Sequence, residues 1–403
     1  MKAYERLLKY VVYDTTSNPN CPDCPSSPEQ LVFARALVEE MKEMGIQDAR
    51  VDADGYVYGS IPATIENAPV IGLIAHMDIA DDAPAQPMKA HVAYNYQGGD
   101  LILDEEGKNV LREADYPLLS RFIGHDLVVT DGNTLLGADD KAGIADILTF
   151  AEKALNTPSL KHGKIAICFT PDEEIGRGPD RFDIPGFGAD FAYTLDGALL
   201  PEIECENFNA AGAKIDITGL STHPGGAKDK MVNAALIAAE LIAMMPAAET
   251  PAHTCGYEGF YHLCEMRGSV EKAFVEYIIR DHDMDKFIAR KAFMENVIAY
   301  LNSKYGEGTL KLDMKDSYYN MKEAIKPHMH VVHRAENAMR KIGMEPYLAP
   351  IRGGTDGATL SNKGLPCPNL PTGSINHHGR FELASVQEMD MVVEMLEKLV
   401  CEE

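Results

Sequence analysis

The sequence predicts an α/β protein of two domains, in which a compact second domain is inserted into the first. Its 403 residues are more than one ordinary hydrophobic core organises. Short apolar segments alternate with helical segments through the first half, which is typical of a largely buried sheet. After residue 207 the pattern changes, and it later returns. We therefore expect a central, mostly parallel sheet flanked by helices over 1–207 and 319–403, interrupted by an inserted domain over 208–318.

Periodicity predicts the elements of the first part. Apolar residues recur at helical spacing from Tyr4 to Val12, and again from Leu31 to Gly45, where the glycine favours a helix end. Another helix is expected over 143–155. Four short apolar segments are expected to be strands of the central sheet, at 70–75, 127–130, 164–170 and 191–195.

The inserted segment has a different order of elements. Strands are expected at 211–219, 259–267, 273–281 and 309–317, and helices at 231–245 and 284–305. This order is β-α-β-β-α-β, the ferredoxin-like motif, which makes a compact domain by itself.

Composition and charge narrow the possible partners. The chain has 62 acidic and 37 basic residues, a formal charge of −25, which opposes binding to phosphate backbones and anionic lipid. The N-terminus lacks the apolar core of a signal peptide, and the apolar stretch around Glu240 is too short to cross a bilayer. We predict a cytoplasmic protein that binds neither nucleic acid nor membrane.

The eight cysteines show no disulfide-framework spacing. Cys21 and Cys24 form a lone CxxC without a second pair at zinc-finger distance, and Cys168 lies in an apolar segment. Free thiols are expected.

Metal-capable residues follow several predicted strands. An imidazole and a carboxylate separated by one residue point to the same side of a strand, so the carboxylate can accept the free ring N–H of a metal-bound histidine. One aspartate before a helix is a normal N-cap, but two exceed that need. Each pattern alone is typical of a structural role. Together they predict a ligand site, because such sites collect beyond the carboxyl ends of strands in α/β sheets. The clusters are His76 with Asp78, Asp139 with Asp140, Glu173 with Glu174, Asp196 with Gly197, and His377 with His378.

This mixed set of imidazoles and carboxylates suits zinc. Its size favours two ions roughly 3.5–4 Å apart, bridged by a carboxylate and a hydroxide. Within the pair Glu173–Glu174, one carboxylate can bind metal while its neighbour acts as general base, because the cations offset the repulsion between them.

Longer motifs, in order along nearly the whole chain, resemble those of a known family. They resemble the peptidase T family, the tripeptide aminopeptidase branch of the di-zinc metallopeptidases related to aminoacylase and glutamate carboxypeptidase. The motifs are IAHMD, TLLGADDKAGIADI, TPDEEIGRG, YTLDG, STHPGGAKDKMVNAA, IIRDHD, IRGGTDGA and PNLPTGSINHHGRFE.

The resemblance implies a role for each matching position of a centre with two zinc ions per subunit. Of the two adjacent histidines, His378 is the better match because it directly precedes Gly379, whereas His377 stands where an aromatic residue is common. The implied roles are first zinc ligands (His76 and Asp196), second zinc ligands (Glu174 and His378), bridging ligand (Asp139), support of His76 (Asp78) and general base (Glu173).

The same resemblance implies that the inserted domain is a lid and dimerisation domain, and that the chain forms a homodimer. His223 would stabilise the oxyanion, Arg280 would hold the peptide carboxylate, and Arg352 falls in a substrate-binding loop. Without the resemblance, His223–Pro224 is typical of a turn and Arg280–Asp281 of a surface ion pair.

The leading hypothesis is a zinc-dependent aminopeptidase that cleaves the first peptide bond of tripeptides. Ile79, where the family usually has a small hydroxyl residue, the segment around Cys21 and Cys24, and residues 104–115 depart from the family pattern. Substrate preference therefore leaves an alternative open, a dipeptidase or an N-acyl amino acid amidohydrolase with the same di-metal centre. A magnesium phosphotransferase or phosphatase is disfavoured by the histidines and by the lack of a glycine-rich phosphate loop. A catalytically silent relative is disfavoured because it would not need Glu173.

Overall fold

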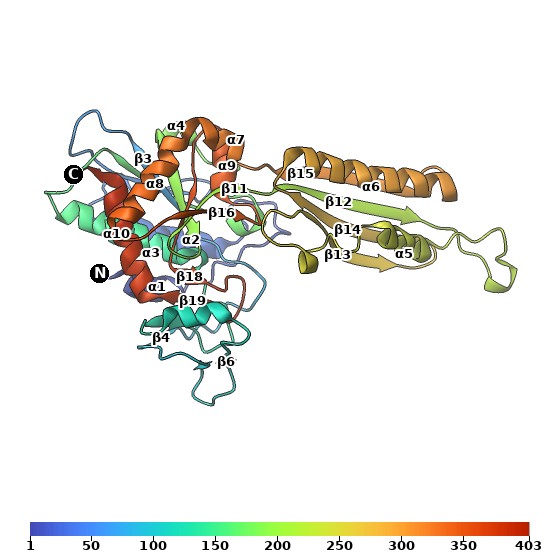
Figure 1. Cartoon of the computed structure of the whole chain (residues 1–403), viewed down its shortest axis with the longest axis horizontal. Coiled ribbons are helices and arrows are strands. Elements are labelled where there is room, and N and C mark those ends of the chain that lie inside the picture. Colours follow the sequence, from blue (N-terminus) through green and yellow to red (C-terminus); the bar gives the residue numbers. More distant parts are fainter. Residues whose placement is uncertain (403) are drawn as a thin grey trace. The chain divides into compact units, whose positions relative to one another are not determined.

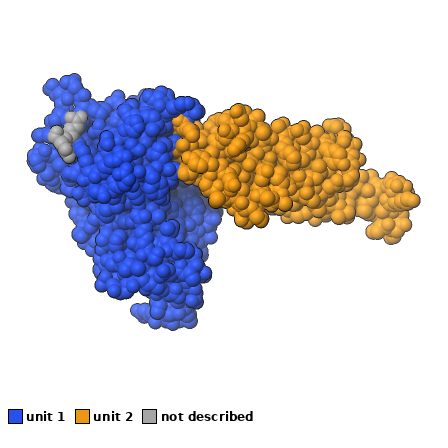
Figure 2. Space-filling model, viewed as in Figure 1, with its two compact units in different colours: residues 1–205, 323–349, 355–403 blue, residues 206–322, 350–354 orange. Residues whose placement is uncertain are grey.

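The computed structural model describes residues 1–402 and separates them into two compact units (Figure 2). Unit 1 contains residues 1–205, 323–349 and the segment from 355 onward, and unit 2 contains residues 206–322 and 350–354. The return of 350–354 to unit 2 is not apparent in the sequence. It arises from contacts within unit 2, where the Ile351 carbonyl lies 3.1 Å from Nε2 of His282.

An eight-stranded mixed sheet forms the centre of unit 1 (Figure 1). Its four central strands are mutually parallel, and its outer strands β1, β2 and β11 pair antiparallel, which confirms the predicted parallel core. Every residue of β3 and β9 is buried, as expected for strands covered on both faces. The order is β1 (Arg50–Val51), β2 (Val57–Ile61), β9 (Ile165–Thr170), β3 (Ile71–His76), β10 (Phe191–Gly197), β17 (Asn369–Pro371), β11 (Glu202–Asn207) and β16 (Tyr347–Ile351).

Helices cover this sheet on both faces. On one face α3 packs against β3 and β10, and α1 and α10 pack onto α3. A Cβ atom at Gly143 of α3 would lie 2.1 Å from the carbonyl oxygen of Leu195, so only glycine allows this approach to the sheet. The other face carries an aromatic cluster that includes Tyr58, Phe182 and Phe187. The helices are α1 (Ala3–Tyr10), α2 (Pro28–Met44), α3 (Ala138–Asn156), α4 (Ile184–Phe187), α7 (Lys322–Ile325), α8 (Met329–Lys341), α9 (Asp356–Asn362) and α10 (Val386–Val400).

A second, antiparallel sheet in unit 1 corrects one expectation. The segment 127–130, placed in the central sheet from its sequence, forms β7 (Leu127–Val129) and pairs instead with β19 (Leu383–Ser385) and β4 (His91–Ala93). Apolar character predicts that a strand is buried but does not select its partner. β18 (Ser374–Ile375) completes this sheet, and short pairs join β5 (Leu101–Ile102) to β6 (Val110–Leu111) and β8 (Lys161–His162) to β20 (Cys401–Glu402).

Unit 2 has the predicted β-α-β-β-α-β order. Its antiparallel sheet runs β13 (Phe260–Gly268), β14 (Lys272–Asp281), β12 (Asn209–Thr218), β15 (Leu310–Tyr318). The helices α5 (Ala234–Met244) and α6 (Met284–Tyr305) accompany this sheet (Figure 1). They share one apolar core with it, and burial alternates along β14. Asn233 and Asp283 cap the two helices by accepting backbone N–H groups of their first turns. The ferredoxin-like prediction is therefore confirmed.

No helix among residues 1–402 is both long and apolar enough to cross a membrane.

One buried carboxyl group of unit 1 has no partner. Asp146 of α3 is fully buried, and within residues 1–402 neither of its side-chain oxygens has a hydrogen-bond partner. Burial, assisted by the charge of Asp390 on α10, raises the pKa of Asp146 well above its usual value. The folded protein therefore holds this proton at pH values where the unfolded chain, with a pKa near 3.9, has lost it.

Asp146→Asn should stabilise the protein at pH 8, because the amide does not titrate and no proton has to be taken up on folding. For an acid with a raised folded pKa, the stabilising contribution is fully present below the unfolded pKa and is lost as pH rises towards the folded value. The advantage of the variant should therefore shrink on approaching pH 4. Thermal unfolding at both pH values, with the exposed Glu394→Gln on α10 as control, measures this difference. An advantage independent of pH would contradict the assignment.

Candidate metal centre

Three neighbouring parallel strands deliver most of the proposed ligands to one edge of the central sheet. His76 ends β3, Asp196 lies near the end of β10, and Glu173 and Glu174 form the turn η2 (Glu173–Ile175) directly after β9. Asp139 lies at the start of α3. Because the carboxyl ends of parallel strands share an edge, residues far apart in sequence meet there.

The ligand atoms form two groups that share Asp139. In one group, His76 Nε2 lies 3.0 Å from Asp139 Oδ1 and 3.5 Å from Asp196 Oδ1. In the other, His378 Nε2 lies 3.0 Å from Glu174 Oε2 and 3.5 Å from Asp139 Oδ2. Within each group all ligand atoms lie within 4.8 Å of one another. The five residues proposed as ligands are thus brought together, although they span 76 to 378.

The two adjacent histidines have different surroundings. His378 is half exposed, its Nδ1 lies 3.1 Å from Asp82 Oδ2, and its backbone has φ 59°, a conformation that costs non-glycine residues about 1–3 kcal/mol. His377 Nε2 is 2.9 Å from Ser374 Oγ and its Nδ1 is 3.4 Å from Asp139 Oδ2. Both rings thus lie at a similar distance from Asp139, but it is His378 that also contacts Glu174 and belongs to a ligand group.

Asp78 supports the site through contacts that its spacing from His76 along the strand does not predict. The nearest acceptor to Nδ1 of His76 is the backbone carbonyl of Asp78 at 3.0 Å, with its carboxylate at 3.5 Å. Both carboxylate oxygens instead accept backbone N–H groups, from Glu173 at 2.9 Å and from Glu174 at 3.1 Å. Asp78 therefore fixes the turn that carries the proposed base as well as the histidine.

The two adjacent aspartates that follow β7, Asp139 and Asp140, make different contacts. Asp139 faces the histidines, whereas the buried carboxyl of Asp140 accepts the N–H groups of His76 at 3.1 Å and Gly143 at 3.2 Å. Asp140 therefore does more than cap a helix, because it connects the start of α3 to the end of β3.

Burial and charge set the basicity of the adjacent glutamates. Burial, with Asp196 adding to it, raises the pKa of Glu173 well above its usual value. Burial and the charge of Asp139 raise the pKa of Glu174 to about 7, against the opposing effect of His378. Glu174 belongs to a ligand group and Glu173 to neither. Glu173 is therefore placed beside the ligand groups without joining them.

The donor set fits divalent metal ions. Asp139 and Glu174 raise the pKa of His378 to about 11, and Asp139 and Asp196, against the effect of burial, raise that of His76 well above its usual value. The carboxylates thus stabilise positive charge at the position where the ligand atoms converge. Neither ligand group contains cysteine, and mixed imidazole and carboxylate donors suit zinc and similar ions rather than thiolate-preferring metals.

Several supporting residues carry no motif signal of their own. Glu382 accepts backbone N–H groups beside Asp139, and Asp172 accepts bonds from Ser26 and Gln30 ahead of Glu173. Asp356, fully buried, accepts from the Thr170 hydroxyl at 2.6 Å. Glu382, Asp172 and Asp356 all lie inside segments that resemble the peptidase T family, and this resemblance is the sequence feature that could have indicated them.

The CxxC segment lies beside the turn that carries the glutamates. Arg177 donates to the carbonyl of Cys21 at 2.5 Å, and the Cys24 thiol donates to the carbonyl of Asp54 at 3.3 Å. All eight cysteines are free thiols, and neither Cys21 nor Cys24 belongs to a ligand group.

His223 and Arg280 lie in unit 2. His223 is exposed at the start of a short 3₁₀ turn, where its Nδ1 accepts the N–H of Gly225 at 3.2 Å. Arg280 is half buried on β14, donates through Nη1 to the Ala211 carbonyl at 3.3 Å and lies over the ring of Tyr318. Among the described residues, Nε and Nη2 of Arg280 have no hydrogen-bond partner, so this edge of the guanidinium is open.

Arg352 is more fully engaged within unit 2. Its Nη1 donates to the carbonyls of Gly256 at 2.7 Å and Glu258 at 2.9 Å, and its Nη2 donates to the Thr254 hydroxyl at 2.9 Å. The guanidinium also stacks over Phe208. These contacts tie the loop 254–258 to the return segment 350–354.

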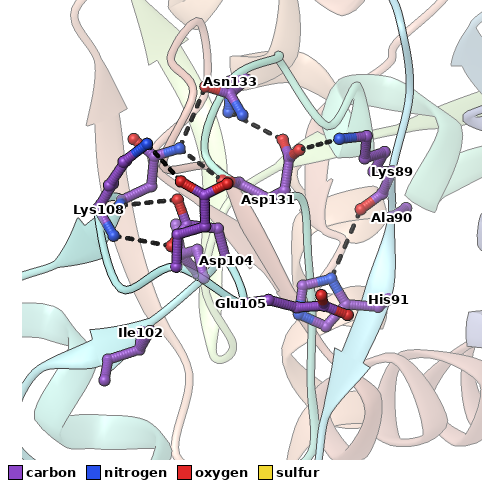
Figure 3. A pocket seen from close by; sticks show the side chains of 12 residues that line it. Lys89, Ala90, His91, Ile102, Asp104, Glu105, Lys108, Asp131 and Asn133 are labelled. Carbon is purple, nitrogen blue, oxygen red and sulfur yellow. Dashed lines mark hydrogen bonds and ion pairs between the residues drawn. The ribbon is translucent and has the colours of Figure 1, made fainter.

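A pocket of about 940 Å³ lies elsewhere in unit 1 (Figure 3). Two of its acidic side chains have partners in the surrounding loops: Asp131 pairs with Lys89 at 3.1 Å, and Asp104 accepts the backbone N–H groups of Lys108 and Asn109. None of the proposed ligands lines it.

Comparisons with known proteins run the length of the chain. A family model described as a peptidase dimerisation domain matches residues 205–309. The peptidase T of Caldanaerobacter subterraneus subsp. tengcongensis is 50% identical over 400 residues, covering 99% of this chain and 98% of that protein.

Solved structures give the same picture of the fold. An aminopeptidase PepT from Bacillus cereus and a tripeptidase from Staphylococcus aureus both have a TM-score of 0.76, at 23% and 22% identity, and each covers 98% of this chain and 97% of its own. A dinuclear metal-binding peptidase of the M20 family from Bacillus subtilis has a TM-score of 0.62 at 14% identity, over 98% of this chain and 97% of its own.

Proposed function

Because the chain belongs to the peptidase T family and is therefore a peptidase, we propose that it removes the N-terminal residue of tripeptides at a centre of two zinc ions. The observation that carries this proposal is the pair of three-residue ligand groups that share Asp139, with Glu173 beside them and outside both. A centre of two ions would agree with the Bacillus subtilis neighbour, which is a dinuclear metal-binding peptidase.

The residues divide the work. His76 and Asp196 would hold one ion, Glu174 and His378 the other, and Asp139 both. When bound, the ions would activate the attacking water and polarise the scissile carbonyl. Glu173 would take a proton from that water and deliver it to the leaving amine, and its burial keeps it basic enough for this task near neutral pH.

Unit 2 would contribute to substrate recognition. We assign Arg280 to the peptide C-terminus, because its guanidinium keeps an open edge that can bind a carboxylate through two parallel hydrogen bonds. His223 would stabilise the oxyanion. Arg352 would act on substrate through the loop 254–258 that it holds.

A competition assay with di-, tri- and tetrapeptides, each with free and blocked ends, tests the proposed substrate. Cleavage of tripeptides at the first bond, lost after chelation and restored by zinc, is expected. Preference for dipeptides or for N-acyl amino acids would replace the aminopeptidase assignment with the alternative chemistry at the same centre. Activity that survives complete metal removal would overturn the metal centre itself.

The protein is also proposed to be a cytoplasmic homodimer. The matched dimerisation domain covers most of unit 2, and the eight free thiols suit a reducing compartment. Light scattering at working concentration should give twice the mass of the chain, and deletion of residues 208–318 should abolish the dimer. A monomeric full-length protein would contradict this prediction.

A further inference from the structure

The buried side chain of Glu382 binds the backbone of the segment that carries Asp139. Its side chain is 2% exposed, and its two carboxylate oxygens accept three backbone N–H groups. Oε2 accepts from Leu136 at 3.0 Å and Gly137 at 2.7 Å, and Oε1 accepts from Asp139 at 2.8 Å. A carboxylate bound by several backbone N–H groups fixes their positions, since such charge-assisted bonds are short and directional.

Glu382 also belongs to the loop that carries His378. This loop, 376–382, connects β18 to β19. The backbone N–H of Glu382 donates to the carbonyl of Gly379 at 3.1 Å and so closes the turn that directly follows His378. One residue therefore shapes the turn after His378 with its backbone and grips the segment before α3 with its side chain.

These two segments supply two of the three ligands in the group formed by Asp139, Glu174 and His378, called the second group below. Asp139 comes from the start of α3 and His378 from the 376–382 loop, 239 positions later in the chain. The third ligand, Glu174, is held independently, because its backbone N–H bonds to Asp78. The separation of Asp139 and His378 thus depends on the contacts of Glu382.

We infer that Glu382 is a positioning residue that sets the spacing between Asp139 and His378 and thereby builds the second metal group. The inference rests on the proposed di-metal centre. Asp139 serves both groups, but only the second group has two ligands on segments that Glu382 joins. Loss of the Glu382 carboxylate should therefore weaken one ion more than the other.

The test compares Glu382→Gln and Glu382→Ala with wild type by titrating the metal-free full-length protein with Zn²⁺ and with Co²⁺. Removal of such outer partners typically costs 10–100-fold in metal affinity. We expect this loss for one ion of the pair, with a changed Co²⁺ absorption spectrum, while the other ion binds more nearly as in wild type. Glu382→Asp keeps the charge and should restore part of the affinity, which a purely space-filling role would not produce.

Glu388→Gln is the matched control. Glu388 lies six positions later, in the first turn of α10, and is 3% exposed, but its carboxylate pairs with Arg121 at 2.9 Å and not with a ligand-bearing loop. This control should bind both ions with wild-type affinity. Circular dichroism of each variant establishes that it is folded.

Two ions bound by Glu382→Ala and Glu382→Gln as tightly as by wild type would overturn the inference, and so would an equal loss in Glu388→Gln. A wild type that binds fewer than two ions would overturn the di-metal centre, an outcome visible before any variant is made. If the variants do not fold, amide hydrogen exchange in wild type decides: Leu136, Gly137 and Asp139 should be strongly protected without metal, and rapid exchange would refute their anchoring.

Discussion

Glu173→Ala should lower turnover by about 10²–10⁴-fold while leaving the metal content nearly intact. The reason is the position of Glu173, which lies beside the two ligand groups but belongs to neither. Its backbone N–H is held by Asp78, so truncating the side chain leaves the turn anchored. Proton transfer in the transition state is then lost while the ions stay bound.

Glu174→Ala is the companion variant. Glu174 is one residue further along the same turn, and its N–H also bonds to Asp78, but its carboxylate lies 3.0 Å from His378 in a ligand group. Its removal should lower metal occupancy as well as activity. Metal analysis of both purified variants, together with steady-state kinetics at saturating zinc, separates the two roles. Equal metal loss in both would show that Glu173 is a ligand rather than the base.

Arg280→Ala should lower kcat/KM for tripeptides by roughly ten- to 150-fold, since one charge-assisted contact is worth about 1.5–3 kcal/mol. An enzyme that measures peptide length needs a fixed cation for the far carboxylate, and a bound carboxylate also helps to hold the scissile bond in place. The open edge of the Arg280 guanidinium provides two donors for this purpose. The loss should appear mainly with substrates that have a free C-terminus.

Amidated tripeptides make the assignment specific. Amidation should cost wild type about as much as the substitution does, and should cost the variant little, because the two changes remove the same contact. Arg267→Ala is a control on the same sheet, where Arg267 pairs with the exposed Glu265 at 2.6 Å. Wild type that cleaves free and amidated tripeptides equally well would rule out this role for Arg280.

The sequence predicts the fold and the ligands to different depths for physical reasons. His76, Asp139, Glu174 and Asp196 follow buried strands or precede a helix, and the rule that parallel strands end at one edge brings them together. The ferredoxin-like order of unit 2 follows from periodicity in the same way. These features depend on residues that are close together in sequence, so the sequence pattern predicts them.

Contacts between side chains and distant backbone leave no such trace. Glu382 binds N–H groups about 245 positions earlier in the chain. In the sequence pattern it is only a polar residue that precedes a short strand. The Asp78 carboxylate likewise binds the turn of Glu173, which strand spacing does not indicate. The choice of β19 and β4 as partners of β7 depends on chain topology, so the apolar pattern of 127–130 predicts the strand but not its sheet.

The position of β17 in the central sheet has a consequence for biosynthesis. β17 (Asn369–Pro371) lies between β10 and β11 in the sheet, so a strand that is synthesised more than 160 residues after both of them fills an interior position. The sheet and helices of unit 2 are complete in sequence at Tyr318. During translation at about 5–20 residues per second, unit 2 can fold while the gap beside β10 is still open. The nascent chain must therefore protect an unfilled apolar edge until residues 369–371 leave the ribosome, and a truncation before residue 369 would leave that edge open permanently.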